Sequence, residues 1–142
     1  MSFGTIGDLN WLAVIVGAIV YFAIGAVWFT PMGFGRPWQR AMGWDPNRTP
    51  PQMSAALYAT PAVAYLLVAI ATGMLAIATG SDTFGSGIVL GLVAGIGYAA
   101  TILAVTATFD PGKPQPWVWF SITAAYHVLG ILVVAVLVSV WH

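Results

Sequence analysis

The chain has 142 residues, a length that predicts one domain covering 1–142. Asp, Glu, Lys and Arg make up 6% of it, against roughly 25% in soluble domains. Hydrophobic residues make up 60%, and there is no cysteine. This composition excludes a soluble globular protein, a disordered chain, a nucleic-acid-binding protein and a disulfide scaffold. The sequence therefore predicts a small integral membrane protein.

The charged residues divide the chain into four long uncharged stretches. A membrane-spanning helix needs about 20 apolar residues to cross roughly 30 Å of hydrocarbon, and each stretch contains one such run. Because four strands could not close a barrel, the spans are predicted to be helices. We expect an all-α bundle of four transmembrane helices, with spans near 9–29, 55–78, 85–109 and 117–141.

The basic residues predict the orientation of the chain in the membrane. Arg36, Arg40 and Arg48 lie between the first and second spans, and Lys113 lies between the third and fourth. The positive-inside rule then places these loops in the cytoplasm and both termini outside, in a multi-pass protein of the inner or plasma membrane. The first span follows no basic residue and is long for the apolar segment of a signal peptide, so we expect it to be retained.

The connection between the first and second spans is the longest loop. Residues 37–42 can form one or two helical turns, with Pro37 at the first helical position. We expect a short interfacial segment at the lipid headgroups, in which Arg36 and Arg40 face phosphates and Trp38 anchors the chain beside them. A loop that binds a substrate or a partner protein is the alternative interpretation.

Two further features predict local helix geometry. The tight polar turn at 80–83 predicts that the second and third spans pack as antiparallel neighbours. Pro61 lies within the second span and is expected to kink that helix or to end its first segment.

Glycines recur every four residues in the third span, at Gly87, Gly91 and Gly95, and a weaker pattern in the first span includes Gly17 and Gly25. Such small residues let helix backbones approach closely. Packing within one bundle and a seam between copies would both explain the pattern. We expect a homo-oligomer, a dimer or a trimer, that assembles through these glycine-rich faces.

Every span carries a tyrosine near its middle, about 10 to 13 residues from its start and therefore roughly 15–20 Å deep. Hydroxyl and imidazole groups in hydrocarbon are costly unless they are hydrogen-bonded. We therefore predict that the polar groups at this depth converge inside the bundle as a candidate ligand pocket. The set comprises His127, Tyr126, Tyr98, Tyr21, Tyr65, Thr123 and Thr101.

This polar set has two main interpretations. It can be a hydrogen-bonded cluster that orients the helices of an accessory or structural protein, which packs against itself or against a larger membrane complex. Alternatively, it can be the pocket of a carrier, channel or sensor for a small apolar molecule. A third hypothesis is haem ligation by His127; ligation by two histidines would need a second copy, because one chain offers a single deep histidine.

Several residue types needed for catalysis or ion coupling are missing. No span contains Asp, Glu or Lys, and no Ser-His-Asp pattern or pair of carboxylates stands out. We therefore expect neither an enzyme nor an exporter driven by intramembrane carboxylates. We predict no metal, no cofactor and no nucleic-acid partner, and we expect the lipid bilayer to be a partner.

The opening forty residues carry a family resemblance. The run Asn10-Trp11, the run Gly25-Ala26-Val27-Trp28-Phe29-Thr30-Pro31, and Phe34-Gly35 followed by Trp38 are similar to the start of the DUF1761 family. That family typically has Gly-Ala-x-Trp-Tyr-Ser-Pro, so Phe29 and Thr30 replace its usual Tyr and Ser. The resemblance implies a four-helix integral membrane protein and carries no established activity or site residues.

Overall fold

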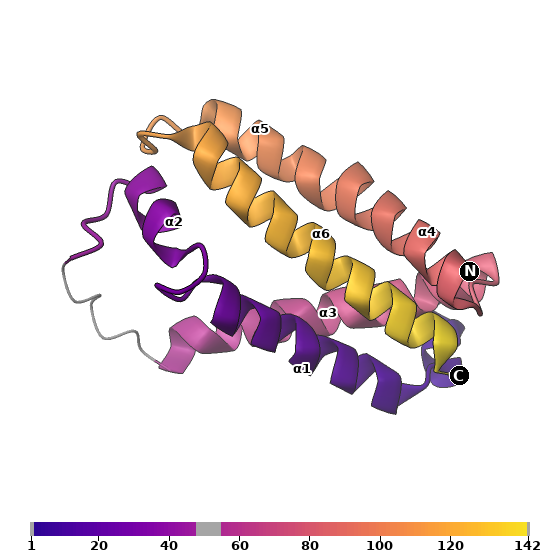
Figure 1. The fold of residues 1–142 in the computed structure, drawn as a ribbon. Coiled ribbons are helices and arrows are strands. Elements are labelled where there is room, and N and C mark those ends of the chain that lie inside the picture. The colour runs from indigo at the N-terminus through magenta and orange to yellow at the C-terminus, as the bar shows by residue number, and fades with distance from the viewer. Residues whose placement is uncertain (1, 48–54, 142) are drawn as a thin grey trace.

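A computed structural model describes the backbone of residues 2–47 and 55–141, and the side chains of 2–47 and 58–141. Arg48 therefore lies outside the described residues. Four helical segments are long and apolar enough to cross a membrane (Figure 1). They are helix α1 (Trp11–Trp28), helix α3 (Ala55–Thr79), the segment Phe84–Phe109 and helix α6 (Pro116–Val140). The prediction of an all-α membrane protein with four spans is confirmed, and the described residues contain no strand.

The third span is not one uninterrupted α-helix. It consists of α4 (Phe84–Ala94), a π-helical segment η2 (Gly95–Ala100) and α5 (Thr101–Phe109). A π-helical turn accommodates an extra residue and disturbs the regular i to i+4 bonding. The Thr101 hydroxyl donates to the carbonyl oxygens of Gly97 (2.7 Å) and Tyr98 (2.9 Å), which gives these carbonyls a partner inside the apolar layer. The sequence pattern gave no sign of this interruption.

The start of α1 and the end of α6 are joined at one end of the molecule. A short 3₁₀-helix, η1 (Phe3–Asp8), leads to Asn10, whose side-chain oxygen accepts a hydrogen bond from the Ala13 amide at 3.1 Å and caps α1. The Asn10 side-chain amide also donates to the carbonyl oxygen of Trp141 at 3.1 Å. This residue therefore ties the start of α1 to the end of α6, and both termini lie at the same end of the molecule in Figure 1.

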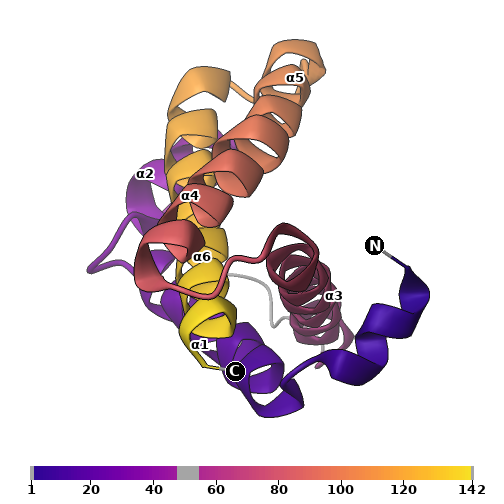
Figure 2. The same cartoon turned by 90° about the vertical axis from the view of Figure 1, so that its right-hand side faces the viewer.

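Helix α6 is the centre of the packing. It contacts α1, α3, α4, η2, α5 and the short helix α2 (Gly35–Ala41). In its most apolar 18-residue stretch 44% of the residues are buried, against 28% in α1 and in α3 and 17% in the third span. Figure 2 shows α4 and α5 on one side of α6, with α1 and α3 on the other.

Helices α3 and α4 are joined by the tight turn, but they do not pack along their lengths. Ala76 of α3 and Leu90 of α4 meet beside Ala135 of α6. Beyond that region α3 packs on α1 and α6, and it lies apart from α5 in Figures 1 and 2. The expectation of neighbouring spans was wrong over most of their length, because α6 offers both helices a better packing surface. Helix α3 continues through Pro61.

A tight backbone elbow connects α1 to α2. The Phe34 amide donates to the Trp28 carbonyl at 2.7 Å, and the Gly35 amide donates to the Thr30 carbonyl at 3.0 Å. A Cβ atom on Gly33 would lie 2.6 Å from the Trp28 carbonyl oxygen, so this close approach requires glycine. The elbow fixes where α2 begins and presses it toward the end of the bundle that lies opposite the termini.

Candidate functional site

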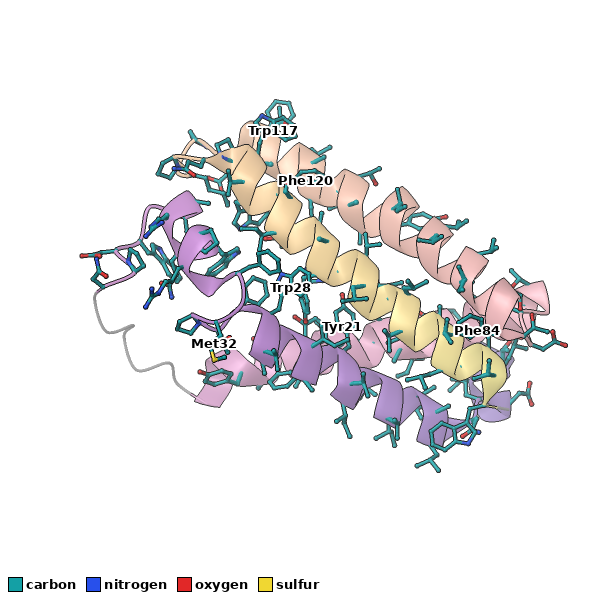
Figure 3. The ribbon with its side chains drawn as sticks, viewed as in Figure 1. Tyr21, Trp28, Met32, Phe84, Trp117 and Phe120 are labelled. Carbon is teal, nitrogen blue, oxygen red and sulfur yellow. The ribbon has the colours of Figure 1, made fainter. Side chains whose placement is uncertain are left out.

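Two tyrosines and two glycines fit reciprocally where α1 crosses α6. Tyr126 of α6 lies over Gly25 of α1, where a Cβ atom would be 2.6 Å from the tyrosine hydroxyl oxygen. Tyr21 of α1 lies over Gly130 of α6, where a Cβ atom would overlap the tyrosine ring. Figure 3 shows Tyr21 between the two helices. Each tyrosine is 1% exposed, so each glycine serves as a socket for a large ring.

Hydrogen bonds connect the same two helices. The Tyr21 hydroxyl lies 2.6 Å from His127 Nδ1, and the Tyr126 hydroxyl donates to the Tyr21 carbonyl oxygen at 3.3 Å. If the histidine is neutral and Nδ1 is its unprotonated nitrogen, the tyrosine hydroxyl donates to it. Polar groups at this depth therefore form hydrogen bonds with one another across the α1–α6 crossing. An unpaired polar group in apolar surroundings would be costly.

Helix α3 completes the cluster with Tyr65. Its ring stacks on the Tyr21 ring with centroids 4.2 Å apart and planes inclined by 17°. It also lies 6.1 Å from the Tyr126 ring and 6.3 Å from the His127 ring. We call Tyr21, Tyr65, Tyr126 and His127 the tyrosine–histidine cluster; it joins three of the four spans.

Aromatic contacts continue from this cluster toward the elbow and α2. The ring of Phe29 lies 5.2 Å from that of Tyr126 and 5.1 Å from that of Trp38. The Trp38 indole N–H donates to the Thr123 hydroxyl at 3.2 Å, and the Trp28 indole N–H donates to the Ile122 carbonyl oxygen at 3.2 Å. Thr123 therefore holds α2 against α6 and is not a member of the tyrosine–histidine cluster.

Tyr98 and Thr101 lie away from the cluster, so the prediction that all of these polar groups converge was wrong for this pair. Tyr98 is 67% exposed on the outside of the third span, and Thr101 is exposed beside it. The π-helical segment supplies the physical reason, since it changes the rotation between α4 and α5. The Thr101 hydroxyl is used by its own helix, as described above.

The glycine stripe of the third span lies against the backbone of α6. A Cβ atom on Gly87, Gly91 or Gly95 would lie 2.9, 2.7 or 3.1 Å from the Cα atom of Val136, Leu132 or Val128, respectively. These glycines therefore form a seam within one chain, and that seam is not available to a second copy. Gly17 of α1 is less tightly opposed, since its Cβ would lie 3.6 Å from the Val134 side chain.

The three residues expected at the lipid headgroups divide into two groups. Arg36 and Arg40 are exposed on α2. Trp38 is half-buried and donates its indole N–H to Thr123 of α6, so part of its side chain packs within the protein, and its place beside the lipid stays a prediction. The structure also exposes Met32, Phe34 and Trp44, which flank the arginines in the sequence; Met32 lies at the outer edge of the elbow in Figure 3.

The glycine sockets were not predicted from the sequence, although a signal for them is present in it. The first span contains Tyr21 followed four residues later by Gly25, and the fourth contains Tyr126 followed four residues later by Gly130. Antiparallel helices that carry the same Tyr-x-x-x-Gly spacing can place each ring over the glycine of the other. Among the described residues no group of three His, Cys, Asp or Glu side chains could hold a metal ion.

Comparisons with known proteins agree with this architecture. No curated protein and no solved structure matches the chain. A family model described as "Protein of unknown function (DUF1761)" matches residues 12–139 and so covers α1 to α6 almost completely. The chain is therefore a member of the DUF1761 family of membrane proteins of unknown function.

Proposed function

We propose that this protein is a non-catalytic accessory membrane protein that assembles with further copies of itself. The copies meet through the outward face of the third span, and the tyrosine–histidine cluster holds each copy in shape. The observation that carries this proposal is the placement of Tyr98. Its side chain is 67% exposed, and its hydroxyl makes no hydrogen bond within the described residues.

The depth of Tyr98 makes that exposure costly in a lone copy. It lies 11 residues before Phe109 and 14 after Phe84, which is about 16 Å and 21 Å from the ends of the span. Lipid chains offer no hydrogen-bond partner, and the side chain is too short to cross half of a hydrocarbon layer roughly 30 Å thick. A neighbouring helix can supply the partner, and such interhelical bonds help membrane helices associate.

The rest of this face suits a helix–helix contact. Gly97 has no atom within 4 Å of the place where its Cβ would be, so it leaves the surface flat beside Tyr98. The exposed threonines differ from Tyr98 because their hydroxyls donate to carbonyls of their own helix, as at Thr106 and Thr108. The outward face consists of Val89, Val93, Ile96, Gly97, Tyr98, Ile102 and Val105, of which all but the glycine are large hydrophobic residues more than half exposed.

Cross-linking tests this interface directly, because the natural chain has no cysteine. Single substitutions Val93→Cys, Ile102→Cys and Val105→Cys introduce thiols on the outward face, and Leu67→Cys introduces an equally exposed thiol on α3 as the matched control. We expect oxidation in native membranes to link copies at one or more of the first three positions and not at Leu67→Cys. Links at the control position alone would overturn the proposed interface.

Native mass spectrometry of gently solubilised protein supplies the copy number. We expect a dimer or a trimer, and we expect Tyr98→Phe to shift it toward the monomer, since the lost bond is worth about 0.6–2 kcal/mol. A monomer for the natural chain, together with no cross-linking, would contradict self-assembly. Co-purification of another membrane protein in place of a second copy would instead indicate a larger membrane complex.

A second candidate function, a carrier, channel or sensor for a small apolar molecule, draws support from His127. The ring is half-buried at mid-depth, and its described hydrogen bond to a side chain uses Nδ1 alone. An ionisable residue inside a membrane span is a default hypothesis for a functional site. A non-lipid mass that the natural chain retains in native mass spectra, and that His127→Leu loses, would favour this function over the accessory one.

A further inference from the structure

The described cations of this protein are divided between two environments. Lys113 is engaged within the chain: its ammonium group donates to the Asp110 carboxylate and lies 4.4 Å from the centroid of the Trp119 ring. That hydrogen bond, together with one from the Gly112 amide, lowers the pKa of the Asp110 carboxyl group. Arg36 and Arg40 are both exposed and form no ion pair with a described carboxylate.

The two arginines act as a pair because of where they lie on α2. They are four residues apart, so they project from one side of the helix with Cβ atoms about 5–6 Å from each other. Asp8 and Asp82 belong to the opposite end of the molecule, at η1 and the α3–α4 turn. Asp110 is engaged by Lys113. Asp45 accepts a hydrogen bond from the Asn47 amide and forms no ion pair with either arginine. The negative charge that complements this pair is therefore expected from outside the described residues.

Helix α2 holds the arginines in a defined position. Trp38 bonds to Thr123 of α6, Ala41 is fully buried, and the Gln115 amide donates to the Ala41 carbonyl oxygen at 3.4 Å. Ala41 also packs in one cluster with Ala107 and Trp119. These contacts join α2 to α6 and to α5, and they leave both arginines exposed.

Exposed apolar side chains flank the arginine pair in the sequence. Met32 is 99% exposed, Phe34 45% and Trp44 46%, although the Phe34 ring packs on Trp28 and the Trp44 ring on Trp38. The exposed parts of these side chains suit the boundary between headgroups and acyl chains, where tryptophan is enriched. A free phosphate ion would contact only the guanidinium groups. A phospholipid would contact both the guanidinium groups and the apolar side chains, so the exposed apolar groups favour a phospholipid.

We propose that Arg36 and Arg40 together bind the phosphate of an anionic phospholipid in the leaflet that α2 meets. The planar guanidinium groups donate in pairs to the phosphate oxygens, and Met32, Phe34 and Trp44 contact the adjoining glycerol and acyl region. This site is independent of the proposed contact between copies, which lies on the outward face of the third span.

The test measures which lipids the protein retains. The protein is reconstituted into vesicles of phosphatidylcholine and phosphatidylglycerol in equal parts, and lipids that remain bound after gentle release are identified by native mass spectrometry. We expect phosphatidylglycerol to be enriched over its bulk share. Replacing both residues (Arg36→Gln and Arg40→Gln) should abolish this enrichment. Each arginine is expected to contribute up to about a fivefold preference for the anionic lipid at low ionic strength.

Two matched variants and two conditions make the result decisive. Lys113→Gln removes a cation that the chain already engages, so enrichment should persist, and the double lysine variant (Arg36→Lys and Arg40→Lys) should retain part of it. If the glutamine variant fails to fold, loss of enrichment with rising salt in the natural chain is the expected result instead. No enrichment in the natural chain, or an unchanged value in a folded glutamine variant, would overturn the proposal. Full displacement of the lipid by inorganic phosphate would also overturn it.

Discussion

Glycines have two different roles in the contacts that helix α6 makes on its two sides. Toward α1, glycines receive large side chains: Gly25 lies under Tyr126, and Gly130 lies under Tyr21. Toward the third span, Gly91 and its neighbours receive a backbone, with the Cα of Leu132 only 2.7 Å from where a Cβ would be. The first contact is a pair of sockets, and the second is a continuous seam.

The two kinds of contact differ in how strongly they fix the register between two helices. A socket admits one ring at one register, and it brings hydrogen-bonding groups together, as Tyr21 and His127 demonstrate. A seam gains dispersion contacts along its whole length, but it has the same four-residue repeat throughout and specifies register weakly. We therefore expect the α1–α6 crossing to tolerate change less than the seam does.

The largest expected effect comes from filling a socket. Gly130→Ala places a methyl group in the space of the Tyr21 ring, which Tyr65 and Tyr126 hold from the other sides. We expect a loss of about 3 kcal/mol in the free energy of unfolding, at the upper end for overpacked cores. Denaturation in detergent measures it, and Gly85→Ala is the control because open space surrounds that position. Equal stability of the two variants would remove the distinction between sockets and other glycines.

A smaller effect is expected at the seam. Gly91→Ala brings a methyl group against the backbone of α6, but α4 can move outward because its other side is exposed. We expect a loss of roughly 1–2 kcal/mol, measured by the same denaturation experiment. Gly85→Ala on the same helix has no neighbour within 4 Å and should be close to neutral. If Gly91→Ala lost more free energy of unfolding than Gly130→Ala, the expectation that the sockets tolerate change less than the seam would be wrong.

The hydrogen bond between Tyr21 and His127 is expected to contribute less than either steric fit. Tyr21→Phe and His127→Leu each leave a polar partner unpaired, so a double-mutant cycle should show a coupling of about 0.6–2 kcal/mol. Tyr58→Phe serves as the control, since this tyrosine is exposed near the start of α3 and its hydroxyl has no described partner within the chain. A coupling near zero would favour the carrier or sensor function, in which these groups serve a ligand and not the fold.

Much of the fold followed from the sequence, because hydrocarbon imposes strong rules on length and hydropathy. The four spans and the membership in one family needed little more than a linear pattern. The candidate site was less predictable. Depth alone placed Tyr98 with Tyr21, although one lies outside the bundle and the other is buried, because depth says nothing about which way a side chain points.

The chain's composition and periodicity determined that this is a four-span membrane protein with small residues on its helix faces and polar groups at mid-depth. Tertiary structure decided which helix lies at the centre, which glycines meet a ring and which meet a backbone, and which tyrosine is left outside. The physical reason is that hydrophobicity in a bilayer orients helices across it but hardly distinguishes one neighbour from another. That choice rests on steric fit and on hydrogen bonds between residues as far apart as Tyr21 and His127.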